Sequence, residues 1–223
     1  MTYKPDFEKA YITANNILIS SSEFGEFPVK TKKLIEGNSA IKCCSYKKAK
    51  KYNGLNIEDL GSKSAILTSI EDKHIIFYNE SDLKARVRFS MLHEYGHYKL
   101  EHNLDVTDEE LYQKYEIETN YFTAQLLMPE QILREIQNRG KKITKDLLIE
   151  LFGVSNEAAE KRINTLNKNL RLTLEEKLFD DIIVSKYKEW LDRNIPQNNN
   201  ISMFLDEYEM QKRKRNMDLL KCI

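Results

Sequence analysis

The pentapeptide His93-Glu94-Tyr95-Gly96-His97 constrains this chain of 223 residues more than any other feature. The run before it, residues 83–92, contains neither proline nor glycine and carries apolar side chains at helical spacing, which predicts a helix. Two residues four apart lie on one face of a helix, one turn above the other, so both imidazoles can reach one zinc ion. Glu94 follows on an adjacent face, where it can accept a proton from water without binding the metal. The pattern predicts a zinc-dependent hydrolase with His93 and His97 as ligands and Glu94 as the catalytic residue.

A catalytic zinc site needs a third protein ligand and a fourth position left open for water. A third histidine would complete the pattern H-E-x-x-H-x-x-G-x-x-H, but Leu100 and Asn103 occupy the last two positions of that pattern here. His102 is one residue out of step. We interpret it as a residue at the surface or behind the ligands.

A second predicted helix, residues 109–128, can supply the third ligand. Glu116 and Asn120 are four residues apart and share a face, so Glu116 can bind the metal while Asn120 orients a ligating imidazole through a hydrogen bond. Glu118 is the alternative ligand, although it points about 200° away from Glu116 around the helix. Spacing and face favour Glu116.

Two segments of the sequence together resemble a known family. Residues 86–102 read RVRFSMLHEYGHYKLEH and residues 116–129 read EIETNYFTAQLLMP. These segments are similar to the ImmA/IrrE-type zinc metallopeptidases, over residues 83–130 and less closely over 143–167. Ser90, Thr119 and Thr123 depart mildly from the family pattern. None of these departures removes a candidate ligand. The residues that fall on the family pattern are Arg86, Arg88, Phe89, His93, Glu94, Gly96, His97, His102, Glu116, Glu118, Asn120, Phe122, Ala124, Leu126, Leu127, Met128 and Pro129.

The resemblance implies both an activity and a partner. Similar proteins cut or inactivate a helix-turn-helix repressor encoded beside them, in mobile elements, prophages or stress regulons. The expected function is therefore that of an anti-repressor, a zinc metalloendopeptidase with a DNA-binding repressor as its protein substrate. The alternative is a non-catalytic zinc protein that sequesters a repressor or antitoxin. An intact Glu94 favours the enzyme, because a purely structural site has no use for this residue and is usually closed by four protein ligands.

The expected fold class is α+β and mainly helical, with a zincin-like core. Residues 65–70 and 74–78 are rich in β-branched and aromatic residues and predict a hairpin, whose edge could bind an extended peptide or only cover the active-site helix. Residues 40–46 predict another strand, and residues 5–20 and 27–35 predict helices. Three domains or segments are expected. The first is a metallopeptidase domain over 1–142, with a small antiparallel sheet within about 39–80 and active-site helices over about 83–101 and 109–128. A helix-turn-helix-like segment over 143–170 packs against it, and a helical extension covers 171–223.

The segment 143–170 also raises the question of DNA binding. A helix, a tight turn at Gly153 and a second helix match the outline of a DNA-reading motif. The second helix, however, begins with Asn156, Glu157 and Glu160, and its acidic groups would repel phosphates. We expect helical packing or partner recognition here rather than direct contact with nucleic acid.

The C-terminal extension predicts two more helices. Residues 173–176 form a capping-box signature that opens a helix ending near 194–196, and Ser202 is suited to cap a final one. The cationic run 212–215 is interpreted as a solvated face.

Charge and cysteine content indicate which partners and which cellular compartment to expect. The chain carries 35 basic and 35 acidic residues, so no bulk attraction to nucleic acid or membrane is expected. The N-terminus is polar, and no apolar run approaches the roughly 20 residues of a membrane helix. Three cysteines, with Cys43 and Cys44 adjacent, do not make a disulfide framework. A cytoplasmic protein is expected.

Overall fold

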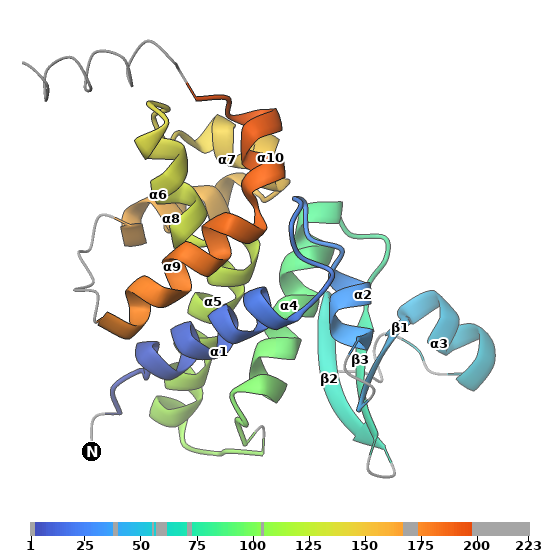
Figure 1. Cartoon of the computed structure of the whole chain (residues 1–223). Helices are drawn as coiled ribbons and strands as arrows, with labels where there is room; N and C mark the ends of the chain where they lie inside the picture. Colours follow the sequence, from blue (N-terminus) through green and yellow to red (C-terminus); the bar gives the residue numbers. More distant parts are fainter. Residues whose placement is uncertain are drawn as a thin grey trace, which may run out of the picture.

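The computed structural model describes residues 3–37, 40–54, 56, 62–70, 73–103, 105–166 and 174–197. The chain is mainly helical, with one three-stranded sheet, as the sequence predicted (Figure 1). In chain order, the elements are α1 (Phe7–Ser20), α2 (Thr31–Glu36), β1 (Ile41–Ser45), α3 (Tyr46–Asn53), β2 (Ala65–Ile70), β3 (Lys73–Tyr78), α4 (Lys84–Lys99), α5 (Glu109–Leu127), α6 (Glu130–Asn138), α7 (Lys145–Phe152), α8 (Asn156–Leu166), α9 (Leu174–Lys186) and α10 (Lys188–Asn194).

The sheet has the order β1-β3-β2 and is mixed. β2 and β3 form the antiparallel hairpin that the sequence predicted, with Leu67 opposite Ile76. The expectation of a fully antiparallel sheet was wrong, because β1 pairs with β3 in parallel. A parallel pair cannot be joined by a tight turn. The chain leaves β1 through α3, an element that the sequence analysis did not anticipate, before the hairpin brings β3 alongside β1.

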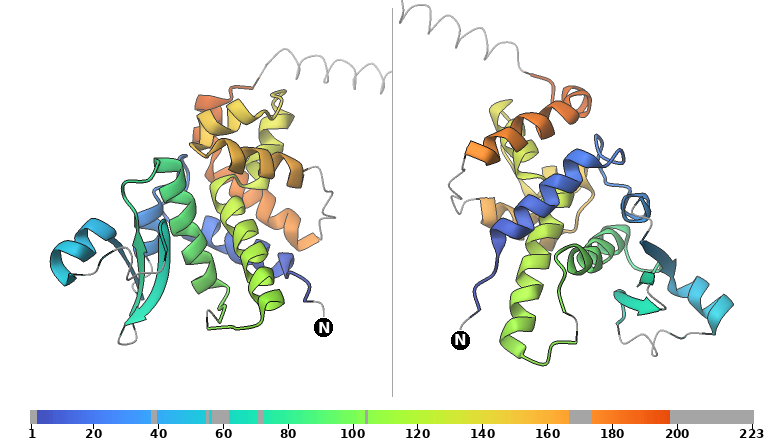
Figure 2. Two further views of the ribbon diagram at one scale, coloured as in Figure 1. Left: turned by 180° about the vertical axis from the view of Figure 1, so that it is seen from behind. Right: turned by 60° about the horizontal axis from the view of Figure 1, so that its bottom comes forward.

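The two faces of the sheet are covered by different helices. Ile76 and Phe77 are neighbours on β3 and therefore point to opposite faces. Ile76 belongs to the main core, which includes residues of α4, whereas Phe77 packs with Tyr46 and Ala49 of α3. As a result, α4 lies between the sheet on one side and α5 on the other (Figure 2).

Helices α4 and α5 pack closely because α4 carries a glycine at their contact. A Cβ atom placed on Gly96 would lie 2.8 Å from Thr119 Cγ2 and 2.9 Å from Phe122 Cδ1, both on α5. Any other residue type would force Thr119, Phe122 or the backbone that carries them to shift. Gly96 thus sets the distance at which residues of α5 face the histidines of α4.

Helices α7 and α8 are tied into the body of the protein. The guanidinium of Arg162, on α8, is fully buried and donates to the carbonyl of Met128 at the end of α5 (3.0 Å) and to Gln125 Oε1 (2.6 Å). Phe152, at the end of α7, stacks edge-on against Phe27. The helix-turn-helix outline therefore belongs to the packed core, with one face of its second helix occupied by these contacts.

Two predicted helices differ in detail from the structure. The helix expected over 27–35 begins only at Thr31, after an irregular segment in which Pro28 lies in a bend. The single helix expected up to about 194 is divided into α9 and α10 at Tyr187, whose ring stacks on Phe27. The predictions for Thr173, Ser202 and the cationic run 212–215 lie outside the described residues.

None of the helices in the described ranges combines the length and the apolar character that crossing a membrane requires.

Candidate metal centre

The middle of α4 presents two histidines toward α5. Residues Met91, Leu92 and Tyr95 face the core and fix the rotation of the helix about its axis. This rotation turns His93 and His97 to the side where α5 passes. His97 has only 4% of its side chain exposed and His93 has 14%. The imidazoles are therefore largely shielded from water but remain accessible at one edge.

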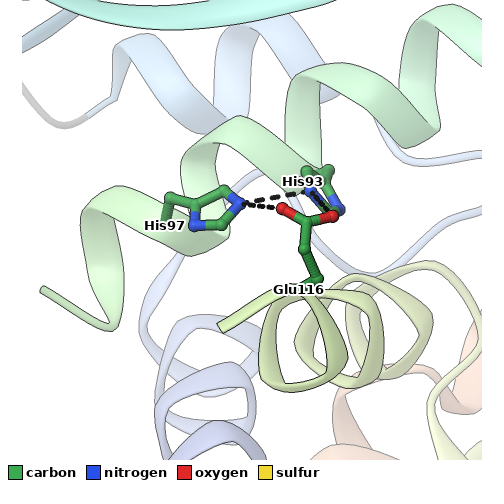
Figure 3. Close-up of side chains that lie close together, drawn as sticks. All are labelled: His93, His97 and Glu116. Carbon is green, nitrogen blue, oxygen red and sulfur yellow. Dashed lines mark hydrogen bonds and ion pairs between the residues drawn. The ribbon is translucent and has the colours of Figure 1, made fainter. Parts of the chain in front are cut away.

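Glu116 completes a three-residue cluster from α5. Its carboxylate points up from α5 between the two imidazoles (Figure 3). Glu116 Oε2 lies 3.3 Å from His93 Nε2, and Oε1 lies 3.2 Å from His97 Nε2. The two Nε2 atoms are 3.2 Å apart. Hydrogen bonds from the imidazoles lower the pKa of the Glu116 carboxyl far below its ordinary value.

The cluster fits a metal ion in both chemistry and spacing. Each residue offers one ligand atom, and these atoms all lie within 4.8 Å of one another. Two atoms bound to a tetrahedral ion at about 2.0–2.1 Å are about 3.3 Å apart, close to the three separations observed here. A shared cation also explains why two imidazole nitrogens and a carboxylate, all of which can act as acceptors, converge on one point.

Glu94 lies beside this cluster and is held by the sheet. Its Oε2 accepts a hydrogen bond from the backbone N–H of Leu67 on β2 (2.8 Å). Burial raises the pKa of the Glu94 carboxyl above its ordinary value, while His93, His97 and the Leu67 N–H act in the opposite direction. The sequence could not predict this partner, because it comes from a strand 27 residues earlier.

The structure separates Glu116 and Glu118. Glu118 points to the other side of α5, where it is buried and contacts His102 Nε2 at 3.0 Å rather than His93 or His97. His102 Nδ1 in turn lies 3.1 Å from His97 Nδ1. The interpretation of His102 as a residue behind the ligands agrees with this contact. The alternative of a surface position does not, because only 3% of its side chain is exposed.

Asn120 is not placed as the sequence analysis expected. It is exposed on α5, and neither imidazole has it as a hydrogen-bond partner. A spacing of four residues turns a side chain by about 40° around a helix, because each residue advances by about 100°. Here this rotation carries Asn120 toward solvent, and the contact with His97 comes from His102 instead.

One residue near the cluster was not predicted from the sequence as part of the site. The carboxylate of Glu116, followed by burial and the carboxylate of Glu94, raises the pKa of Tyr112, which is 43% exposed. Tyr112 precedes Glu116 by four residues, so helical spacing alone could have drawn attention to it. Its position puts a phenol at the open edge of the site.

A cavity of about 600 Å³ adjoins the cluster. Its walls are formed by Leu67, Thr68 and Ser69 of β2, by His97 and Tyr98 of α4, and by the segment that follows α4. The edge of the sheet and one candidate metal ligand, His97, therefore line the same space.

The segment that carries this cluster matches a known protein family. Residues 54–164 match the sequence model of the IrrE N-terminal-like domain, Peptidase_M78. The chain belongs to the ImmA/IrrE-type family. The matched range contains the hairpin, both site helices and most of the helix-turn-helix-like segment. A search of curated proteins gave no match.

The family membership gives the site its general chemistry. Peptidase_M78 is a metallopeptidase family, and His93, His97 and Glu116 form the group in the described part of the chain that can hold a metal. The geometry thus brings together, as a group that could hold a metal, the same three residues that the resemblance implies.

Proposed function

We propose that this protein is a zinc-dependent endopeptidase that cleaves a helix-turn-helix repressor. The observation that supports it best is the convergence of His93, His97 and Glu116 at separations of 3.2–3.3 Å, with Glu94 buried next to them. Two imidazoles and one carboxylate are a ligand set of catalytic zinc sites, which leave one position open for water, whereas structural zinc sites are usually closed by four protein ligands.

In peptide hydrolysis, three of these residues would bind the metal and Glu94 would transfer protons. When zinc is bound by His93, His97 and Glu116, it supplies Lewis acidity toward the scissile carbonyl and toward water. Glu94 accepts the proton of the attacking water and delivers it to the leaving amine. Its hydrogen bond from Leu67 N–H fixes the position of the carboxylate for both transfers.

Strand β2 provides a surface on which an extended peptide can bind. It is an edge strand of the sheet, and its Leu67 N–H points away from β3, toward the site. Main-chain groups of an edge strand can pair with a substrate backbone and require little from its sequence. The cavity beside β2 would then receive side chains of the bound peptide next to the metal.

The repressor as substrate follows from family resemblance. An exposed segment of a repressor could lie along β2 in extended form, whereas a folded helix could not pair with a strand edge. We therefore expect cleavage in a linker or an unfolded segment of the repressor.

Incubation of the protein with the repressor encoded beside it tests the proposal. The wild-type protein should produce zinc-dependent fragments on a gel. Glu94→Gln should retain zinc and lower the cleavage rate about 10²–10⁴-fold, the usual contribution of a general acid–base residue. Glu150→Gln, an exposed glutamate on α7, is the matched control and should cut at the wild-type rate.

Two outcomes would contradict the proposal. Full activity of Glu94→Gln would remove the catalytic role of this residue. A stable complex of wild-type protein and intact repressor, with zinc present and no fragments, would identify a sequestering protein instead.

A further inference from the structure

The two ligating imidazoles differ in what supports them. His93 Nδ1 is buried and has no hydrogen-bond partner in the part of the chain that the structure describes. His97 Nδ1, in contrast, lies 3.1 Å from Nδ1 of His102, and His102 Nε2 lies 3.0 Å from Glu118 Oε2. A line of three side chains therefore runs from the candidate metal position into the protein.

One arrangement of protons satisfies every contact along this line. A nitrogen that binds metal carries no proton, so the proton of neutral His97 is on Nδ1. It donates to Nδ1 of His102, which must then be an acceptor, and the proton of His102 is on Nε2, from which it donates to Glu118. The hydroxyl of Thr119 also lies 3.3 Å from His102 Nδ1.

The far end of the line is fixed by independent contacts. Glu118 Oε1 accepts from the backbone N–H of Asp6, ahead of α1, at 2.5 Å, and Lys114 Nζ lies 3.5 Å from it. The ring of His102 stacks on Tyr115 with centroids 4.1 Å apart and an interplanar angle of 12°. Only 3% of the His102 side chain and 5% of the Glu118 side chain are exposed. These contacts leave the pair little freedom to turn.

We propose that His102 and Glu118 are positioning residues that hold His97 in the tautomer and orientation required for metal binding and thereby set the affinity of the site. This inference rests on the proposed function for the presence of a metal at His97. Hydrogen bonds to the second nitrogen of a ligating histidine fix its orientation and raise its basicity. The carboxylate of Glu118 extends this effect through a second imidazole.

Metal affinity and ligand geometry, rather than cleavage, test the inference. His102→Phe keeps a ring to stack on Tyr115 and removes both nitrogens, and Glu118→Gln keeps the shape of the side chain and removes its charge. His74→Phe is the matched control, because its ring contacts Ser69 and Tyr98 instead of the line. For each protein, zinc affinity is measured by competition with a chromophoric chelator. The visible spectrum of the cobalt-loaded form and the melting temperature of the metal-free form are recorded alongside.

The expected result is a loss of affinity with a change at the metal itself. His102→Phe should bind zinc about 10–100-fold more weakly than wild type, the usual effect of removing a partner of a ligand. Glu118→Gln should weaken binding less, in the same direction. The cobalt spectrum should change in both, and His74→Phe should match wild type. A merely structural role would lower the metal-free melting temperature and leave the cobalt spectrum unchanged.

The outcomes separate this inference from the proposed function. Wild-type affinity and an unaltered cobalt spectrum in both variants would overturn the positioning role, and Glu118→Gln decides the question alone if His102→Phe does not fold. If the wild-type protein binds no zinc, the proposed function fails as well. Weakened binding in both variants supports the positioning role even if no repressor is cut.

Discussion

Helix α5 carries two polar clusters that differ in chemistry and in burial, since Glu116 is partly exposed and Gln125 is fully buried. Toward its N-terminal half, Glu116 meets two imidazole nitrogens, and all three groups can act as acceptors. At its C-terminal end, Gln125 donates to Asn15 Oδ1 (2.8 Å) and to Gln131 Oε1 (2.9 Å), and it accepts from Arg162.

The difference shows how a functional cluster can be told from a structural one. At Gln125, each contact joins a donor to an acceptor, so the network satisfies buried groups and fixes α1, α6 and α8 against α5. At Glu116, two imidazole nitrogens and a carboxylate converge on one point, and each of the three groups can bind a metal ion. The same helix thus holds a site that can bind a ligand and a network that needs none.

Removal of a ligand should give the largest effect at the first cluster. Glu116→Ala should weaken zinc binding more than about 100-fold, because a direct ligand contributes more than the partners behind it. Zinc should raise the melting temperature of the wild-type protein and leave that of the variant almost unchanged. Calorimetric titration and thermal unfolding with and without zinc measure both effects, with Glu150→Gln as control. Wild-type zinc affinity in Glu116→Ala would rule out this ligand set.

Removal of the buried arginine should lower the stability of the fold and leave zinc affinity unchanged. Arg162→Leu leaves the Met128 carbonyl without its buried donor and leaves Gln125 Oε1 with the backbone N–H of Glu130 alone, and should lower the free energy of unfolding by about 2–5 kcal/mol. The loss should be equal with and without zinc, and zinc affinity should be retained. Urea unfolding measures it. The exposed neighbour Lys161→Ala should change the free energy of unfolding by no more than about 0.5 kcal/mol. A selective loss of zinc affinity in Arg162→Leu would mean that the two clusters are coupled.

A smaller effect is expected where the two site helices touch. Gly96→Ala places a methyl group against Thr119 and Phe122. Overpacking costs about 1–3 kcal/mol, of which the better helix propensity of alanine offsets up to about 1 kcal/mol. A net loss of about 1–2 kcal/mol in urea unfolding should come with weaker zinc binding, because α5 must shift and carry Glu116 with it. Unchanged zinc affinity would show that α5 does not shift at Glu116.

The smallest effect tests the position of Asn120. Because this side chain is exposed and contacts neither imidazole, Asn120→Ala should change the free energy of unfolding by less than about 0.5 kcal/mol and leave zinc affinity at the wild-type value. A tenfold loss of zinc affinity in the chelator competition would restore the role that the sequence suggested for it.

Local spacing was sufficient to predict much of the site. The helical repeat puts His93 and His97 on one face whatever surrounds them, and it separates Glu116 from Glu118 by more than half a turn. The content of β-branched and aromatic residues predicted the hairpin in the same way, since strand propensity is a property of a few consecutive residues.

Contacts between distant segments decided the remainder. The parallel pairing of β1 with β3, the hydrogen bond from Leu67 to Glu94 and the contact between His102 and Glu118 all depend on where separate elements come to lie. Asn120 shows the limit most clearly. A helical repeat fixes which residues share a face, but only the packing of α5 against its neighbours determines how much of that face is turned toward the metal and how much toward water.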